Sequence, residues 1–231
     1  MKSIFLSIIF ARSLFADWYN IALDCVEYDY QRPIVVCITS HNNKDQFKSC
    51  LDSVFSQNYS NYRVIYIDDA STDKTYNLLL EYVEINNLNE RVIVLRNDEK
   101  EGELLNHYLM GNLCEEEEII VPLDGKDRFM TNKALETINK AYMNQDVWVT
   151  YGQFMEIEDS IKPKALLKHK YHSNLLKKTS LIFKQPRTYY AWLFRHIPKE
   201  CFAMEESGDI MIMSYLIELS RSHTYFIPDG Y

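Results

Sequence analysis

Several features that identify common classes of protein are scarce in this chain of 231 residues. Its five cysteines are scattered and form no CxxC pair, so the sequence indicates buried reduced thiols rather than a zinc site or a disulfide framework. Basic residues are fewer than acidic ones, and the formal net charge of −8 argues against a nucleic-acid partner. The six histidines have no spacing typical of a metal site or a catalytic triad.

A long hydrophobic run is also absent from the N-terminal segment, residues 1–30. Lys2 and the apolar stretch Ile4–Phe10 resemble a signal peptide. Arg12 interrupts the apolar region and Leu14–Ala16 is a poor cleavage sequence, so a packed amphipathic helix fits the segment equally well. The stretch is too short and too interrupted to span a bilayer, and two outcomes are open for it: peripheral anchoring to a membrane, or removal. The unpaired cysteines favour a cytoplasmic location, whereas a working signal would make the protein secreted or membrane-peripheral.

What the sequence does contain suits one globular domain with a small appendage. Hydrophobic residues make up 47% of the chain, which is enough for a large core, and no low-complexity stretch indicates disorder. We therefore assign residues 31–231 to a single domain. Lysine and arginine gather between Lys162 and Arg195, where they would meet an anionic ligand such as a diphosphate or form an ordinary solvated face.

Apolar segments of strand length alternate with amphipathic segments of helix length from Pro33 onwards. The predicted strands are 33–40, 62–69, 91–95, 118–123 and 147–154, and the helices between them are 45–57, 73–83, 103–114 and 131–143. This alternation predicts an α/β fold with a mostly parallel central sheet and helices on both faces. The rest of the chain is predicted as an irregular segment over 155–186, helices over 187–197 and 209–219, and a short strand over 225–227.

Polar residues follow the predicted strands at the points where the strands end. The stretch Arg63–Asp69, RVIYIDD, ends in two adjacent carboxylates, and the other ends are Ser40–Asn42, Asn97 and Asp124–Asp127. Because the carboxyl ends of parallel strands meet at one edge of a sheet, we expect these side chains to converge. Turn formation alone explains small polar residues, but it does not explain so many carboxylates. Clustered acids repel one another unless a cation or a donor-rich ligand lies among them, so the sequence predicts a ligand site here.

Seven segments together carry a family resemblance. They are PIVVCITSHNN at 33–43, SCLDSVFSQNYSNYRVIYIDDASTDKT at 49–75, RNDEKEGELLNHY at 96–108, LDGKDRF at 123–129, VWVTYGQF at 147–154, RTYYAWLF at 187–194 and GDIMIMSYLIELS at 208–220. This set resembles family 2 glycosyltransferases, which are nucleotide-diphospho-sugar transferases of the GT-A fold. LDGKDRF stands where the family usually has a motif such as LDGDDW. The resemblance implies a Rossmann-like GT-A domain with a helical C-terminal region on the acceptor side.

The resemblance implies that a hexose moves from a UDP-sugar to a hydroxyl of an unidentified glycan, protein or lipid acceptor, with inversion. Thr39, Ser40 and Asn42 would then line the base and ribose. Asp68 or Asp69 would accept hydrogen bonds from the uracil or the ribose, because a carboxylate only accepts. The other implied donor-binding residues are Asn97, Gly102, Asn106, Asp124, Gly125, Lys126 and Arg187.

Inverting transfer also needs a general base on the acceptor hydroxyl. The resemblance assigns this role to Asp209, at the start of a late predicted helix, where Glu205 or Glu206 could substitute and a helix N-cap is the alternative role for Asp209. The alternative function is a non-catalytic or degenerate nucleotide-sugar-binding domain. A nucleotidyltransferase is disfavoured, because no glycine-rich basic loop follows the first predicted strand.

The resemblance further implies a divalent cation, Mn²⁺ or Mg²⁺, held by Asp124 and Asp127. The family's usual second ligand falls on Lys126, whose ammonium group offers only donors and would pair with these carboxylates. Three outcomes are open: Asp127 takes over as ligand, Lys126 itself neutralises the diphosphate in a metal-independent reaction, or catalysis is lost. In the second case Lys126 and Arg128 would form a diphosphate clamp.

Overall fold

The computed structural model describes residues 30–152, 184–203 and 208–228. Backbone contacts divide the chain into two units, Met1–Gln31 and Arg32–Tyr231, and the description below concerns the second unit. The signal peptide or helix predicted at the N-terminus lies outside the described residues, as does most of the irregular segment predicted over 155–186. No helix within the described ranges is both long enough and apolar enough to cross a membrane.

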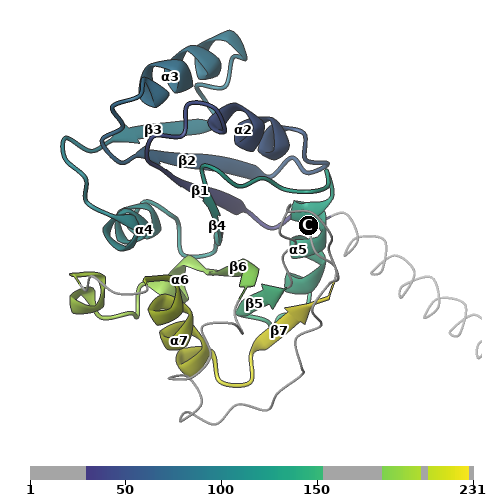
Figure 1. Ribbon diagram of the computed structural model, residues 1–231. Helices are drawn as coiled ribbons and strands as arrows, with labels where there is room; N and C mark the ends of the chain where they lie inside the picture. The colour runs from purple at the N-terminus through teal and green to yellow at the C-terminus, as the bar shows by residue number, and fades with distance from the viewer. Residues whose placement is uncertain (1–29, 153–183, 204–207, 229–231) are drawn as a thin grey trace, which may run out of the picture. The chain divides into compact units, whose positions relative to one another are not determined.

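The described strands form a seven-stranded sheet in the order β3-β2-β1-β4-β6-β5-β7 (Figure 1). They are β1 (Ile34–Ser40), β2 (Tyr62–Asp68), β3 (Val92–Arg96), β4 (Ile119–Asp124), β5 (Val149–Gly152), β6 (Lys184–Tyr190) and β7 (Thr224–Ile227). Parallel pairing joins β3 to β2, β2 to β1, β1 to β4 and β5 to β7, whereas β6 is antiparallel to both of its neighbours. The predicted mostly parallel α/β sheet is confirmed, and β1 to β4 place their carboxyl ends at one edge.

Helices cover both faces of this sheet. They are α2 (Phe47–Phe55), α3 (Thr75–Ile85), α4 (Glu103–Asn112), α5 (Ala134–Tyr142), α6 (Ala191–Phe194) and α7 (Gly208–Ser220), with a short 3-10 helix at Lys199–Ala203. Figure 1 shows α2 and α3 on one face of the β1–β3 region and α4 on the other. The side chains of Ile34–Ile38 are consequently at most 1% exposed, as expected for a central strand that is apolar along its whole length.

The predicted helix over Arg187–Ile197 was wrong. Its first residues belong to β6, which also includes the last three residues of the predicted irregular segment, and only the single turn α6 follows. Thr188 and Tyr189 are β-branched and aromatic residues that favour strands. The Thr188 hydroxyl contacts Thr150 Oγ1 on β5 at 2.6 Å and Tyr142 Oη on α5 at 2.9 Å, so side-chain contacts with two other elements stabilise the strand. The spacing of the aromatic residues at 190–194 suggested one continuous helix. In the structure, β6 ends and the short helix α6 begins within this stretch.

Gly111 on α4 is where this helix packs most closely against α6. A Cβ atom added at Gly111 would lie 2.2 Å from Cε1 of Phe194. Phe194 is 2% exposed, and its ring is stacked on Tyr189 and packed against Phe202, so it has no room to withdraw. The absence of a side chain at Gly111 therefore sets the position of α4.

Substitution of Gly111 by alanine is expected to destabilise the fold. Alanine in a helix normally stabilises by about 1 kcal/mol relative to glycine. The forced contact with Phe194 costs about 1–3 kcal/mol of overpacking, which outweighs that gain. Urea unfolding should therefore show a lower midpoint for Gly111→Ala, whereas Leu109→Ala at a 39% exposed position of the same helix should change the midpoint little. A Gly111→Ala variant more stable than the parent would contradict this packing.

Candidate functional site

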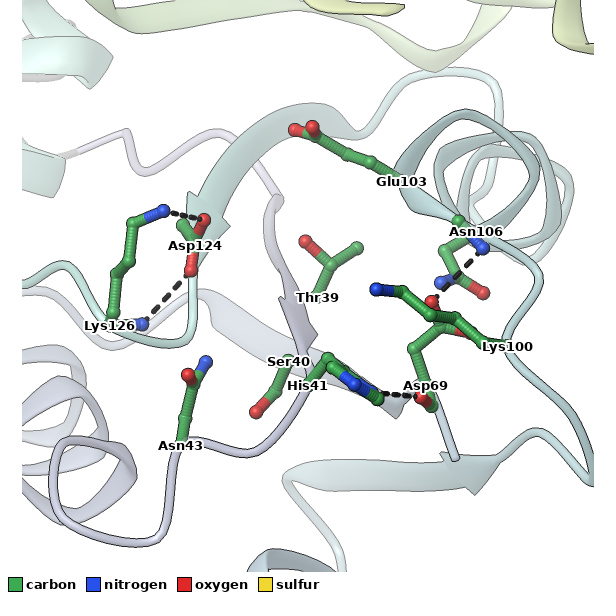
Figure 2. Close-up of a pocket in the computed structure, with 11 residues that line it drawn as sticks. Thr39, Ser40, His41, Asn43, Asp69, Lys100, Glu103, Asn106, Asp124 and Lys126 are labelled. Atoms are coloured by element: carbon green, nitrogen blue, oxygen red, sulfur yellow. Dashed lines mark hydrogen bonds and ion pairs between the residues drawn. The ribbon is translucent and has the colours of Figure 1, made fainter. Parts of the chain in front are cut away.

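A cavity of about 330 Å³ lies where the strand ends meet the start of α4 (Figure 2). The register of the sheet brings the strand ends together, because Ser40 pairs with Asp68 and Thr39 pairs with Asp124. The cavity is lined by Thr39, Ser40, His41, Asn43, Asp69, Lys100, Gly102, Glu103, Asn106, Asp124 and Lys126. Its volume is at the lower end of the range for small-molecule sites, ~300–1,000 Å³. The predicted convergence of strand ends is therefore present.

Asp69 is the most firmly held carboxylate of the cavity. Asn97 Nδ2 donates to its Oδ1 at 2.7 Å, and the backbone amides of Glu101 and Gly102 donate to Oδ1 and Oδ2 at 2.9 and 3.0 Å. Burial alone would raise the pKa of the Asp69 carboxyl group, but these hydrogen bonds outweigh it and lower the pKa below its ordinary value. Asp69 is thus a fixed, ionised acceptor that ties β2 to the loop before α4.

The loop after β1 is fixed against Asp69 and the turn after β2. His41 Nδ1 lies 2.6 Å from the backbone oxygen of Asp69, which can only accept, so Nδ1 carries the proton. The other ring nitrogen then accepts from Asn42 Nδ2 at 3.1 Å. Asn42 has a positive φ of 56°, and its Oδ1 accepts from the Thr72 amide. Asn42, predicted to line the base, is not among the cavity residues; it joins the two loops.

Asp68 occupies a different position from its neighbour Asp69. Its side chain is fully buried, its Oδ2 accepts from the Ser71 amide at 3.1 Å, and Arg96 Nε lies 3.5 Å from the same atom. Asp68 therefore stabilises the turn that follows β2. The structure places it outside the cavity lining, unlike the predicted contact with uracil or ribose.

Two other residues that were predicted to contact the sugar nucleotide, Asn97 and Gly125, do not line the cavity. They hold together the elements that form it. Asn97 Nδ2 donates at 2.7 Å to Asn106 Oδ1 as well as to Asp69, which aligns the first turn of α4 with the end of β2. Gly125 makes a backbone hydrogen bond to the oxygen of Thr39, and a Cβ atom there would come within 2.8 Å of Ser40 Cβ. Glycine is therefore required for the close approach of the two strand ends.

Asp124 is paired with Lys126, as the sequence predicted for a lysine at this position. Lys126 Nζ lies 2.9 Å from Asp124 Oδ2, and the backbone amide of Lys126 donates to Oδ1 at 3.0 Å. The hydrogen bond and the charge of Asp124 raise the pKa of Lys126, so its ammonium form is favoured. Both oxygens of Asp124 are therefore already engaged by this one residue.

The described residues do not fit a preformed site for Mn²⁺ or Mg²⁺. Partial desolvation and the charge of Asp124 raise the pKa of Asp127, which weakens it as a ligand. Among the residues that the structure describes, no group of three or more His, Cys, Asp and Glu side chains is placed to hold a metal ion. These cations prefer several oxygen ligands, whereas one Asp124 oxygen lies against an ammonium group and the other accepts from a backbone amide.

Two other predicted site residues are not among the described residues that line this cavity. Arg187 on β6 lines a separate, very small cavity together with His107, Pro122, Tyr189, Ile212 and Met213. Asp209 is the second residue of α7, in agreement with a position at the start of a late helix, but its side chain lies outside what the structure describes.

Four residues of the cavity lining were not singled out from the sequence: His41, Asn43, Lys100 and Glu103. Lys100 and Glu103 lie within two residues of the predicted contact Gly102, and this proximity in the sequence could have identified them. Two lining atoms, Ser40 Oγ and Asn106 Nδ2, are buried and have no hydrogen-bond partner among the described residues. Buried polar atoms are seldom left unpaired, so a ligand that reaches both atoms fits this cavity.

The comparisons with known proteins concern most of the chain. The profile of one family, described as Glycosyl transferase family 2, matches residues 35–204. A curated relative, the putative teichuronic acid biosynthesis glycosyltransferase TuaG of Bacillus subtilis (strain 168), is 35% identical over 72 residues. That stretch is 31% of this chain and 27% of the relative.

Two solved structures share the fold. TarS 1-349 of S. aureus matches with a TM-score of 0.66 at 15% identity, over 86% of this chain and 58% of that one. The mannosyltransferase PcManGT from Pyrobaculum calidifontis, in complex with GDP-Man and Mn²⁺, matches with a TM-score of 0.62 at 14% identity, over 88% and 56% of the two chains. TarS 1-349 is also known in complexes with UDP and with UDP-GlcNAc. This chain spans less than two thirds of each relative, and by the family match it belongs to glycosyl transferase family 2.

Proposed function

We propose that this protein transfers a hexose from a UDP-sugar to a hydroxyl group of a glycan, protein or lipid acceptor, with inversion. The observation that carries the proposal is the ionised Asp69 in a cavity at the carboxyl ends of β1, β2 and β4. Ligands of open α/β sheets bind at this edge. Family membership and the TarS complexes with UDP and UDP-GlcNAc support the same choice of donor.

The cavity chemistry suits a nucleoside diphosphate. Asp69 Oδ2 accepts one hydrogen bond from the chain, so it has capacity for an N–H or O–H group of the nucleoside. Ser40 Oγ and Asn106 Nδ2 offer further donors to ligand oxygens. The ammonium groups of Lys100 and Lys126 supply positive charge for the diphosphate.

In the proposed reaction, Asp209 at the start of α7 takes the proton of the acceptor hydroxyl. The acceptor oxygen then forms a bond to the anomeric carbon while the bond from that carbon to the diphosphate oxygen breaks. The leaving group departs as UDP with both bonding electrons, and attack from the opposite face inverts the configuration. The positive groups of the cavity stabilise the negative charge that develops on the diphosphate.

A second candidate is a non-catalytic nucleotide-sugar-binding domain. The observation that favours it is the pairing of Lys126 with Asp124, at the position where the family's motif has carboxylates. Release of UDP from UDP-hexoses in the absence of acceptor separates the two candidates, because slow hydrolysis requires a working transfer site. Binding of UDP without turnover of any UDP-hexose, with or without acceptor, would favour the second candidate.

The Asp209→Asn variant tests the general base. Asparagine retains the hydrogen-bonding shape at the start of α7 but cannot accept the proton. Turnover is expected to fall ~100-fold or more, which is the usual contribution of a general base, while the Kd for UDP stays unchanged. Glu218→Gln, at an exposed position of the same helix, is the matched control and should retain full turnover. Turnover by Asp209→Asn at the parent rate would remove Asp209 from the mechanism.

The Asp69→Asn variant tests the donor site. Its side chain has one NH2 group in place of a carboxylate oxygen, which would face the backbone amide of Glu101 or that of Gly102, so one bond that holds the loop before α4 would be lost. Calorimetry should show UDP affinity reduced by about tenfold or more.

The control is Asp73→Asn. Asp73 also accepts backbone hydrogen bonds, from Lys44 and Thr75, but it does not line the cavity. This variant should lose some stability and retain UDP affinity. Equal losses of affinity in both variants would show that the effect of Asp69→Asn is one of general stability rather than of the donor site.

A further inference from the structure

We infer that this site binds the diphosphate of its donor without a divalent cation, with the ammonium groups of Lys126 and Lys100 in the place of the metal. The inference rests on the proposed function, because it concerns how the same cavity holds the same donor. Its first support is the state of Asp124, whose two oxygens lie 2.9 and 3.0 Å from the side-chain and backbone nitrogens of Lys126. A divalent cation at Asp124 would have to displace or approach that ammonium group, and like charges repel strongly at such distances.

Lys126 can bind the ligand while it stays paired with Asp124. An ammonium group has three donors, and the ion pair with Asp124 uses one of them. The Lys126 side chain is 64% exposed, so the remaining donors are accessible from the cavity that it lines. Asp124 therefore acts as a positioning residue, which holds the ammonium group at the end of β4. The nearby charge of Glu103 further favours the ammonium form of Lys126.

Lys100 supplies a second positive charge from the opposite side of the cavity. Figure 2 shows its ammonium group pointing into the cavity beside Asn106, across from the loop that carries Lys126. Lysines on two sides can contact both phosphates of a diphosphate, and Asn106 Nδ2 and Ser40 Oγ add neutral donors between them. Among the carboxylates that line the cavity, Asp69 and Asp124 accept hydrogen bonds from the chain. The sequence had suggested a diphosphate clamp made of Lys126 and Arg128. Arg128 does not line the cavity.

The test is calorimetric titration of UDP and of uridine into the full chain, in excess EDTA and in excess MnCl₂. For the parent protein, the Kd for UDP should be the same in both buffers. Lys126→Ala should weaken UDP binding by about tenfold in both, the usual effect of losing a hydrogen bond to a charged group, and should leave uridine binding unchanged. Lys126→Asp should bind UDP weakly in EDTA and recover affinity in MnCl₂, because it restores a pair of carboxylates at this loop.

Lys133→Ala and Lys133→Asp are the matched controls, since Lys133 is an exposed lysine near the same loop that does not line the cavity. Both should bind UDP as the parent does. UDP binding by the parent in MnCl₂ but not in EDTA would overturn the inference and leave the proposed function intact. An equal loss of uridine and UDP affinity in Lys126→Ala would also overturn it, by showing a disrupted site. Failure of the parent to bind UDP in either buffer would instead overturn the donor assignment itself.

Discussion

The site depends on the parallel, in-register pairing of β1 with β2 on one side and β4 on the other. This pairing puts Ser40 beside Asp68 and Thr39 beside Asp124, so residues more than 80 positions apart in the chain reach the same edge. β1 is apolar and buried on both faces, as is typical of a central strand in a parallel sheet. The backbone bonds from Asp69 to Ser40 and from Gly125 to Thr39 extend the pairing just past the strand ends. The cavity begins where that pairing stops.

The two adjacent carboxylates at the end of β2 have different surroundings, although they are neighbours in the chain. Asp68 is the last residue of the strand and turns inward, where Ser71 and Arg96 hold it. Asp69 lies beyond the strand, and its carboxylate faces the cavity while amides of the next loop hold it. Asp68 shapes the turn, and Asp69 presents a charged acceptor to the cavity. The lowered pKa of Asp69 keeps it ionised across the neutral and mildly acidic range.

Much of this arrangement could be predicted from the sequence because it depends on local patterns. Apolar strands and amphipathic helices up to β5 follow period and length, and the convergence of strand ends follows from parallel pairing. β6 could not be predicted in this way, because Thr188 is held by Thr150 and Tyr142, which are distant in the sequence. The same limit applies to Asn42 and Asp68: the sequence places them at strand ends but does not show which way their side chains turn. Lys126 was the exception, since an ammonium group between two carboxylates has a predictable partner.

We propose that the ion pair of Lys126 with Asp124 lets the chain itself offset the charge of a bound diphosphate. A site for a sugar nucleotide must offset the charge of a diphosphate, and carboxylates alone do so only through a bound cation. In this cavity a lysine is placed against the carboxylate, and a second lysine faces it. The positive charge is then part of the chain, and its position is set by the end of β4 and the loop before α4.

The most direct test of this account is a crystal structure of the protein with UDP, grown in EDTA. The account predicts the uridine beside Asp69 and diphosphate oxygens within hydrogen-bonding distance of Lys126 Nζ. A diphosphate bound outside this cavity, or one turned away from both Lys126 and Lys100, would contradict it.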